Sequence, residues 1–138
     1  MTLLVDTSVW SLALRRDTDS AAPEVEALRG ALEGADTVVT TGLVLQELLQ
    51  GFSGAKDKPK IIASFASLPL LQPDREDHIA AAELRNVCRR AGVQIGTIDA
   101  LIAQLCIRHG LTLLSTDKDF AFAARHTKLK LWSGSSGA

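Results

Sequence analysis

The chain opens with Thr2-Leu3-Leu4-Val5-Asp6, an apolar run that ends at a carboxylate. A short run of Leu and Val is typical of a buried strand, so we predict a strand over residues 2–6. Residues 8–15 follow as a predicted helix, with Thr7 or Ser8 as its N-cap. Asp6 therefore lies at the carboxyl end of a buried strand, where the chain turns into a helix.

The same order of strand and helix repeats along the chain. We predict further strands over residues 37–40, 70–72, 111–115 and 129–132. We predict further helices over residues 23–33, 41–52, 60–67, 74–90, 97–109 and 119–125. Alternation of this kind predicts an α/β fold with a parallel or mostly parallel sheet that helices cover on both faces.

Apolar spacing within three of these helices predicts their buried faces. The predicted stripes are Val25, Leu28 and Leu32; Leu45, Leu48, Leu49 and Phe52; and Ile98, Leu101, Ile102, Leu105 and Cys106. Thr97 as N-cap of the third helix would put Asp99 in its first turn.

Length and composition fit one globular domain. We expect residues 1–132 to form it and residues 133–138 to be a flexible Ser/Gly tail. Hydrophobic residues make up 46% and charged residues 22%, and a net charge of −1 argues that any nucleic-acid binding uses a local basic patch. No membrane span or signal peptide is expected. The two cysteines, Cys88 and Cys106, form no C-x-x-C pair, which favours free thiols in a reducing cytoplasm.

Four carboxylates stand in apolar surroundings: Asp6, Glu47, Asp99 and Asp117. Removing an ionised carboxylate from water costs several kcal/mol unless a partner compensates. For the first three, no Lys or Arg lies within helical reach along the chain. A shared cation would resolve this, and oxygen ligands suit Mg²⁺ or Mn²⁺.

Each acid taken alone also has an ordinary structural explanation. Asp6 could cap the next helix, Asp117 could form an Asx-turn, and Asp99 could complement a helix dipole. Glu47 could face solvent. The histidines show no metal-ligand spacing, and nucleophile-elbow, Walker A and dinucleotide-binding motifs are absent from the sequence.

Four short motifs, in this order, resemble the PIN domain and within it the small VapC-type toxin ribonucleases of toxin–antitoxin pairs. They are Val5-Asp6-Thr7-Ser8, Gln46-Glu47-Leu48, Ile98-Asp99-Ala100-Leu101-Ile102-Ala103 and Ser115-Thr116-Asp117-Lys118-Asp119-Phe120. The resemblance covers about residues 2–132 and implies a three-layer α/β/α sandwich.

The resemblance also implies a Mg²⁺-dependent endoribonuclease, with Mn²⁺ as a substitute. Asp6, Glu47, Asp99 and Asp117 match the catalytic acids, of which we expect the three aspartates to bind the metal. Ser8, Thr116 and Asp119 match supporting positions, although Asp119 could instead cap the short helix that follows it. A homodimer and a small antitoxin protein as partner are implied as well.

RNA would need cations near an acidic site. The candidates are Arg15, Arg16 and Lys118, with Lys56, Lys58 and Lys60 in a loop. Alternatives to the toxin are a PIN nuclease of RNA processing or quality control and a catalytically silent metal-binding interaction domain. A receiver-type signalling domain is disfavoured, because the late strand ends without the lysine that this class requires.

Overall fold

The computed structural model of the protein describes residues 1–15 and 22–134. Its five strands form one sheet in the order β3-β2-β1-β4-β5, and all four pairings are parallel. The strands are β1 (Thr2–Val5), β2 (Thr37–Thr41), β3 (Leu70–Leu71), β4 (Thr112–Leu114) and β5 (Lys130–Leu131). The prediction of a parallel sheet is confirmed.

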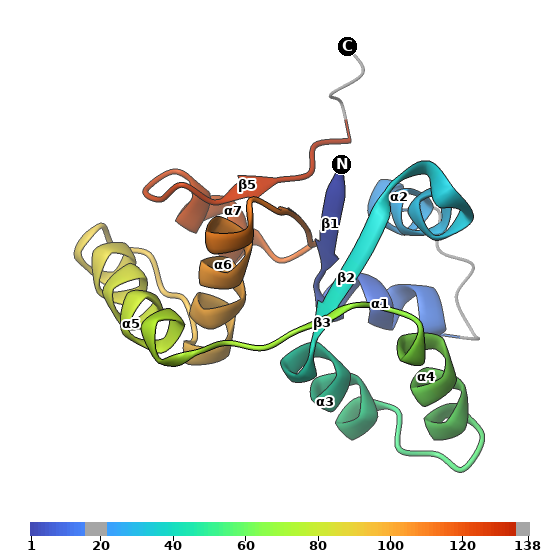
Figure 1. Cartoon of the computed structure of the whole chain (residues 1–138). Coiled ribbons are helices and arrows are strands. Elements are labelled where there is room, and N and C mark those ends of the chain that lie inside the picture. Colours follow the sequence, from blue (N-terminus) through green and yellow to red (C-terminus); the bar gives the residue numbers. More distant parts are fainter. Residues whose placement is uncertain (16–21, 135–138) are drawn as a thin grey trace.

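Helices cover both faces of this sheet. They are α1 (Thr7–Leu14), α2 (Pro23–Gly30), α3 (Gly42–Gly51), α4 (Asp57–Ala66), α5 (Arg75–Arg90), α6 (Thr97–His109) and α7 (Lys118–Ala124). In Figure 1, α5 and α6 lie on one side of the strands, and α1 and α2 lie on the other. This is the three-layer α/β/α arrangement. No helix among the described residues is long and apolar enough to cross a bilayer.

The strand order creates a switch point between β1 and β4. The chain builds β2 and β3 on one side of β1 and then returns to add β4 and β5 on the other. Asp6 continues this central pairing, since its N–H donates to the Leu114 carbonyl at 2.9 Å. In open α/β sheets, ligands bind beyond the carboxyl ends of the strands at such a switch point.

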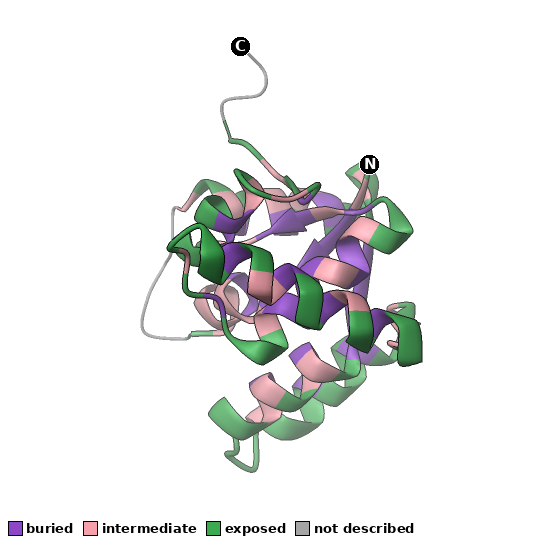
Figure 2. Cartoon of the chain, turned by 90° about the vertical axis from the view of Figure 1, so that its left-hand side faces the viewer, coloured by how far each residue is buried: buried purple, intermediate pink, exposed green. Residues whose placement is uncertain are grey.

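The core lies between the central strands and the helices that cover them. Leu3, Leu4 and Val5 of β1 and Leu113 and Leu114 of β4 are fully buried. Figure 2 shows the burial concentrated in the strands and in the inner faces of the helices, with exposed residues on the outside. Burial on both faces explains why these strands read as continuous apolar runs instead of alternating ones.

Two of the predicted helix stripes are wrong at one position each. Leu32 is exposed because it lies in the turn Ala31–Ala35 that ends this helical segment, where Gly34 leaves helical geometry with a φ of 107°. Ile98 is exposed as well, since it lies in the first turn of α6, at the open end of the helix. The rest of both stripes is buried.

Helix α3 buries the predicted Leu48, and the other predicted residues pack at the edge of the core, but the most buried face is turned toward Val44. Val44 and Leu48 are its buried residues, whereas Leu45, Leu49 and Phe52 are half-buried. The N-cap of α6 is Gly96, so Thr97 is the first residue of the helix and not its cap. Asp99 lies in the first turn, as predicted.

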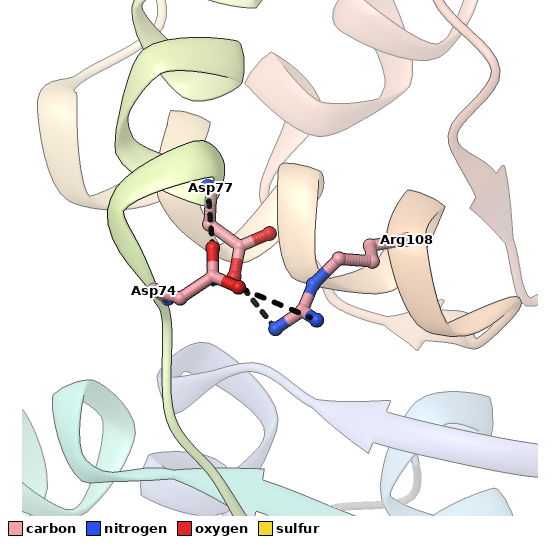
Figure 3. Close-up of polar contacts among 3 residues, drawn as sticks. All are labelled: Asp74, Asp77 and Arg108. Atoms are coloured by element: carbon pink, nitrogen blue, oxygen red, sulfur yellow. Dashed lines mark hydrogen bonds and ion pairs between the residues drawn. The ribbon is translucent and has the colours of Figure 1, made fainter.

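A buried charge that the sequence interpretation missed fastens α5 to α6. Asp77 is fully buried, and its Oδ2 lies 2.7 Å from an Arg108 nitrogen and accepts the Asp74 N–H at 2.9 Å. Asp74 caps α5 by accepting the Asp77 N–H at 2.9 Å and lies 3.8 Å from Arg108. Figure 3 shows the three side chains converging from the start of α5 and the last turn of α6. We call this group the Asp77–Arg108 clamp.

Candidate active site

Asp6 is held by two serine hydroxyls from opposite ends of the chain. Its Oδ2 accepts the Ser8 hydroxyl at 2.8 Å and the Ser115 hydroxyl at 2.9 Å. Asp6 is also the N-cap of α1, where Oδ2 accepts the Ser8 N–H at 3.4 Å, so neither Thr7 nor Ser8 is the cap. Only 5% of Asp6 is exposed. A buried carboxylate thus has one oxygen fixed by three donors.

Asp117 is tied to one of these serines, Ser115. Its N–H donates to the Ser115 hydroxyl at 3.0 Å, and its side chain caps α7 by accepting the Asp119 N–H at 2.9 Å. Thr116 is exposed, and it contacts the site through its backbone N–H, which donates to Ser8 Oγ at 3.1 Å. Ser115 therefore links two of the acids. Sequence reasoning missed it, although it ends the same apolar run as Asp117.

Glu47 reaches the site from a third segment. It lies in the middle of α3 and is half-buried, and its Oε1 accepts the Thr7 hydroxyl at 3.0 Å. Thr7 directly follows Asp6 at the carboxyl end of β1. The hydrogen bond turns the Glu47 carboxylate toward the switch point and away from bulk solvent.

Asp99 is where the negative charges meet. Burial, which contributes most, and the nearby charges of Asp6, Asp117, Glu47 and Asp119, in that order, together raise the pKa of Asp99 to about 6. Carboxylates from β1, α3, α6 and the β4–α7 junction thus act on one another, although up to 111 positions separate them in the chain (Asp6 and Asp117). We call Asp6, Glu47, Asp99 and Asp117 the acidic site.

Asp6 and Asp117 do have the structural roles that their positions in the sequence allow, and these roles do not exclude a further role in the acidic site. Each caps a helix, but capping uses Oδ2 of Asp6 and Oδ1 of Asp117. Within the described parts of the chain, no hydrogen bond to the second oxygen of either carboxylate is present, and no Lys or Arg pairs with an acid of the site. Asp119 is not the cap of α7 but a residue of its first turn.

The predicted RNA-contacting residues are spread over the molecule. Lys118 is exposed and stands between Asp117 and Asp119, next to the acids. Arg15 is the C-cap of α1 and Asp6 its N-cap, so the two lie about 14 Å apart along the helix axis. Arg16 lies outside the described residues. Lys56, Lys58 and Lys60 are exposed at the start of α4.

The donors of the acidic site suit a hard divalent cation in their chemistry. All are carboxylate oxygens with hydroxyl groups beside them, and their mutual repulsion is uncompensated by any described Lys or Arg. In residues 1–15 and 22–134, however, no three Asp, Glu, His or Cys side chains are already placed to share one metal ion. Forming such a site would require side-chain rotation.

The fold and the acidic site together define an α/β protein with carboxylate oxygens gathered at the switch point of a parallel sheet. Comparison with known proteins agrees with this class. The PIN domain model matches residues 3–125. The VapC ribonuclease Mb1587 of Mycobacterium bovis and ribonuclease VapC11 of Mycobacterium tuberculosis are both 35% identical over 130 residues, 93% of this chain and 96% of theirs. The chain belongs to the PIN-domain family, and within it to the VapC ribonucleases.

Solved structures show the same fold. The chain resembles one from VapBC2 of Rickettsia felis, crystallised with a DNA fragment from its promoter. The TM-score is 0.72 with 24% identity, over 96% of this chain and all of that one. At this level of identity the likeness concerns the fold alone.

Proposed function

We propose that the protein is a metal-dependent endoribonuclease and the toxin of a toxin–antitoxin pair, acting on RNA in the cytoplasm. The observation that carries this proposal is the convergence of Asp6, Glu47, Asp117 and Asp119 on Asp99 at the switch point. The relatives' names, VapC ribonuclease and ribonuclease VapC11, support the same activity. PIN nucleases generally use a divalent metal, and we propose Mg²⁺, with Mn²⁺ as a substitute.

Within this proposal, Asp6, Asp99 and Asp117 would hold the metal, and Glu47 would hold it or orient a water molecule. A divalent ion bound there supplies an activated water near neutral pH and offsets charge on the phosphodiester oxygens. Ser8 and Ser115 fix the Asp6 carboxylate. Thr7 orients Glu47, and the exposed Lys118 between Asp117 and Asp119 would contact a phosphate.

Two partners complete the proposal. Solved structures of similar fold include VapBC2 and a toxin–antitoxin complex from Klebsiella pneumoniae, which supports a small antitoxin protein as the inhibitor of this chain. We also propose a homodimer, in line with the family resemblance. Light scattering at micromolar concentration that gives a monomer would count against the dimer without touching the nuclease.

Cleavage of cellular RNA by wild type and Asp99→Asn tests the activity. We expect the variant to lose at least about 100-fold in rate, because even residues that only support metal ligands typically contribute about 10–100-fold. Chelation of divalent metal should silence wild type. Asp36→Asn is the matched control, since Asp36 pairs with the N-terminus at the opposite end of β1. An Asp99→Asn protein that cleaves at the wild-type rate would falsify the site.

A further inference from the structure

A cleft lies between α5 and the first turns of α6. Its volume is about 260 Å³. Ala81 and Leu101 form part of its buried floor, and His78, Arg85, Asn86 and Thr97 bring polar groups to its walls. The volume is below the ~300–1,000 Å³ of typical drug-sized ligand pockets. It suits one nucleotide better than a helix of a protein partner.

Arg85 is the fixed cation of this cleft. Its side chain is half-buried, and its Nε donates to the Ile95 carbonyl at 2.9 Å. No carboxylate in the described parts of the chain forms an ion pair with Arg85. A guanidinium that is anchored through Nε keeps its terminal nitrogens for a ligand, and this planar fork matches a phosphate in geometry and charge.

Positive charge continues from the cleft along the end of α5. Arg89 lies beside Arg85 around a small adjoining hollow, and one of its terminal nitrogens donates to Asn86 Oδ1 at 3.0 Å. Arg90 follows in the same last turn. In a chain whose net charge is −1, this is a local basic patch of the kind that phosphate backbones recognise.

The cleft is a short distance from the acidic site. Thr97 on its wall and Asp99 in the acidic site belong to the same first turn of α6. Side chains two residues apart on a helix point to nearly opposite sides. The cleft and the acidic site are therefore separated by the width of one helix, ~10 Å. A strand of RNA that crosses the start of α6 would reach both.

We infer that this cleft binds one nucleotide of the RNA substrate next to the bond that is cut, with its phosphate on Arg85 and its sugar or base against Ala81 and Leu101. This inference rests on the proposed ribonuclease function. His78, Asn86 and Thr97 supply donors and acceptors for the 2′-hydroxyl or a base edge. A protein partner in the cleft is the competing outcome of the test.

Binding of a short, fluorescein-labelled single-stranded RNA of mixed sequence, followed by anisotropy in EDTA, measures the site without cleavage. We expect Arg85→Ala to bind at least about five-fold more weakly. The slope of log affinity against log salt should become shallower by about 0.7, the value for one lost phosphate contact on a single strand. Arg75→Ala, at the exposed start of α5, is the matched control and should bind as wild type does.

Ala82→Glu tests the cleft without removing the Arg85 anchor. Ala82 is exposed and lines the cleft, so a carboxylate there would repel a phosphate and occupy the space. We expect at least about five-fold weaker RNA binding, whereas Ala63→Glu on the exposed face of α4 should change nothing.

The outcomes separate the two levels of the argument. If wild type neither binds nor cleaves RNA, the proposed function fails and the cleft assignment fails with it. If wild type does both while Arg85→Ala and Ala82→Glu match it in affinity and salt slope, the cleft assignment alone is overturned. Variants that keep RNA affinity but no longer bind the antitoxin would reassign the cleft to a protein.

Discussion

The acidic site and the Asp77–Arg108 clamp both take carboxylates out of water, but only the clamp has a cation of its own. Asp77 is completely buried, and Arg108 lies 2.7 Å from it. Asp6 is 5% exposed, and among the described residues no Lys or Arg pairs with it or with Glu47, Asp99 or Asp117. The two groups therefore differ in whether the fold supplies a cation for the carboxylates that it takes out of water.

The pKa values move in opposite directions for this reason. Burial acts to raise the pKa of Asp77, but the Asp74 N–H and Arg108 outweigh it and hold that pKa below its usual value. At Asp99, burial and neighbouring carboxylates act together, and the pKa rises to about 6. A carboxylate whose pKa is raised by burial and by neighbouring carboxylates, in a fold whose described residues supply no cation for it, marks a candidate functional site.

Removing the cation of the clamp should have the largest effect on stability. Loss of one partner from a buried pair costs about 3–5 kcal/mol. Arg108 itself is 39% exposed, so we expect Arg108→Met to lower the unfolding free energy by about 2–3 kcal/mol. Methionine keeps most of the aliphatic stem. Urea denaturation near neutral pH measures the change.

Two further variants sharpen that result. Arg29→Met breaks the exposed pair with Glu26 and should cost no more than about 0.5 kcal/mol. Adding Asp77→Asn to Arg108→Met removes the orphaned charge and should recover part of the loss. A wild-type urea midpoint for Arg108→Met would show that the clamp does not hold α5 to α6.

Asp99→Asn should have the opposite effect and stabilise the metal-free protein. The folded pKa of Asp99, about 6, exceeds its ordinary value of 3.8, so the folded state binds more protons between these limits. Its contribution to stability therefore falls as pH rises from about 4 to about 6 and is constant above that. After allowance for solvent screening, we expect a gain of roughly 1 kcal/mol for Asp99→Asn above about pH 7.

Urea unfolding in EDTA at about pH 4 and about pH 7.5 checks this sign. The difference between Asp99→Asn and wild type should nearly vanish at the lower pH. The clamp contributes a constant amount over the same range, because the folded pKa of Asp77 is lowered and its stabilisation is lost only as pH falls below the unfolded value. A difference that grows toward low pH would refute the electrostatic account of the acidic site.

Periodicity and apolar runs were sufficient to predict the parallel sheet and to single out four acids that the fold brings near one another. Asp6 and Asp117 follow strands that are buried on both faces, and the sequences of these strands are therefore mostly continuous runs of apolar residues. Ser115 was not predicted, because its partner Asp6 lies 109 positions away and a serine after a strand has no distinctive neighbours. Contacts of that range depend on the strand order, which local patterns do not contain.

The same limit explains the errors on the helices. The Asp74 and Asp77 spacing matches a capping box, but nothing local distinguishes an exposed cap from one that Arg108 buries. The leucine spacing in α3 fits several faces of the helix, and the most deeply buried face is the one that holds Val44 and Leu48. Which face is buried depends on the neighbours that the fold supplies.

Ser115→Ala should have a smaller effect on stability than Arg108→Met. It removes a hydrogen-bond donor from Asp6, a buried acid of the acidic site that, unlike Asp77, has no cation beside it among the described residues. Ser8 still donates to Asp6 Oδ2, so we expect a stability loss of only about 1 kcal/mol. RNA cleavage and Mn²⁺ affinity should each fall by about 10-fold, as for other groups that orient metal ligands. Ser115→Thr keeps the hydroxyl and should restore both. If Ser115→Ala loses stability but retains wild-type Mn²⁺ affinity, Ser115 supports the fold and not the orientation of Asp6.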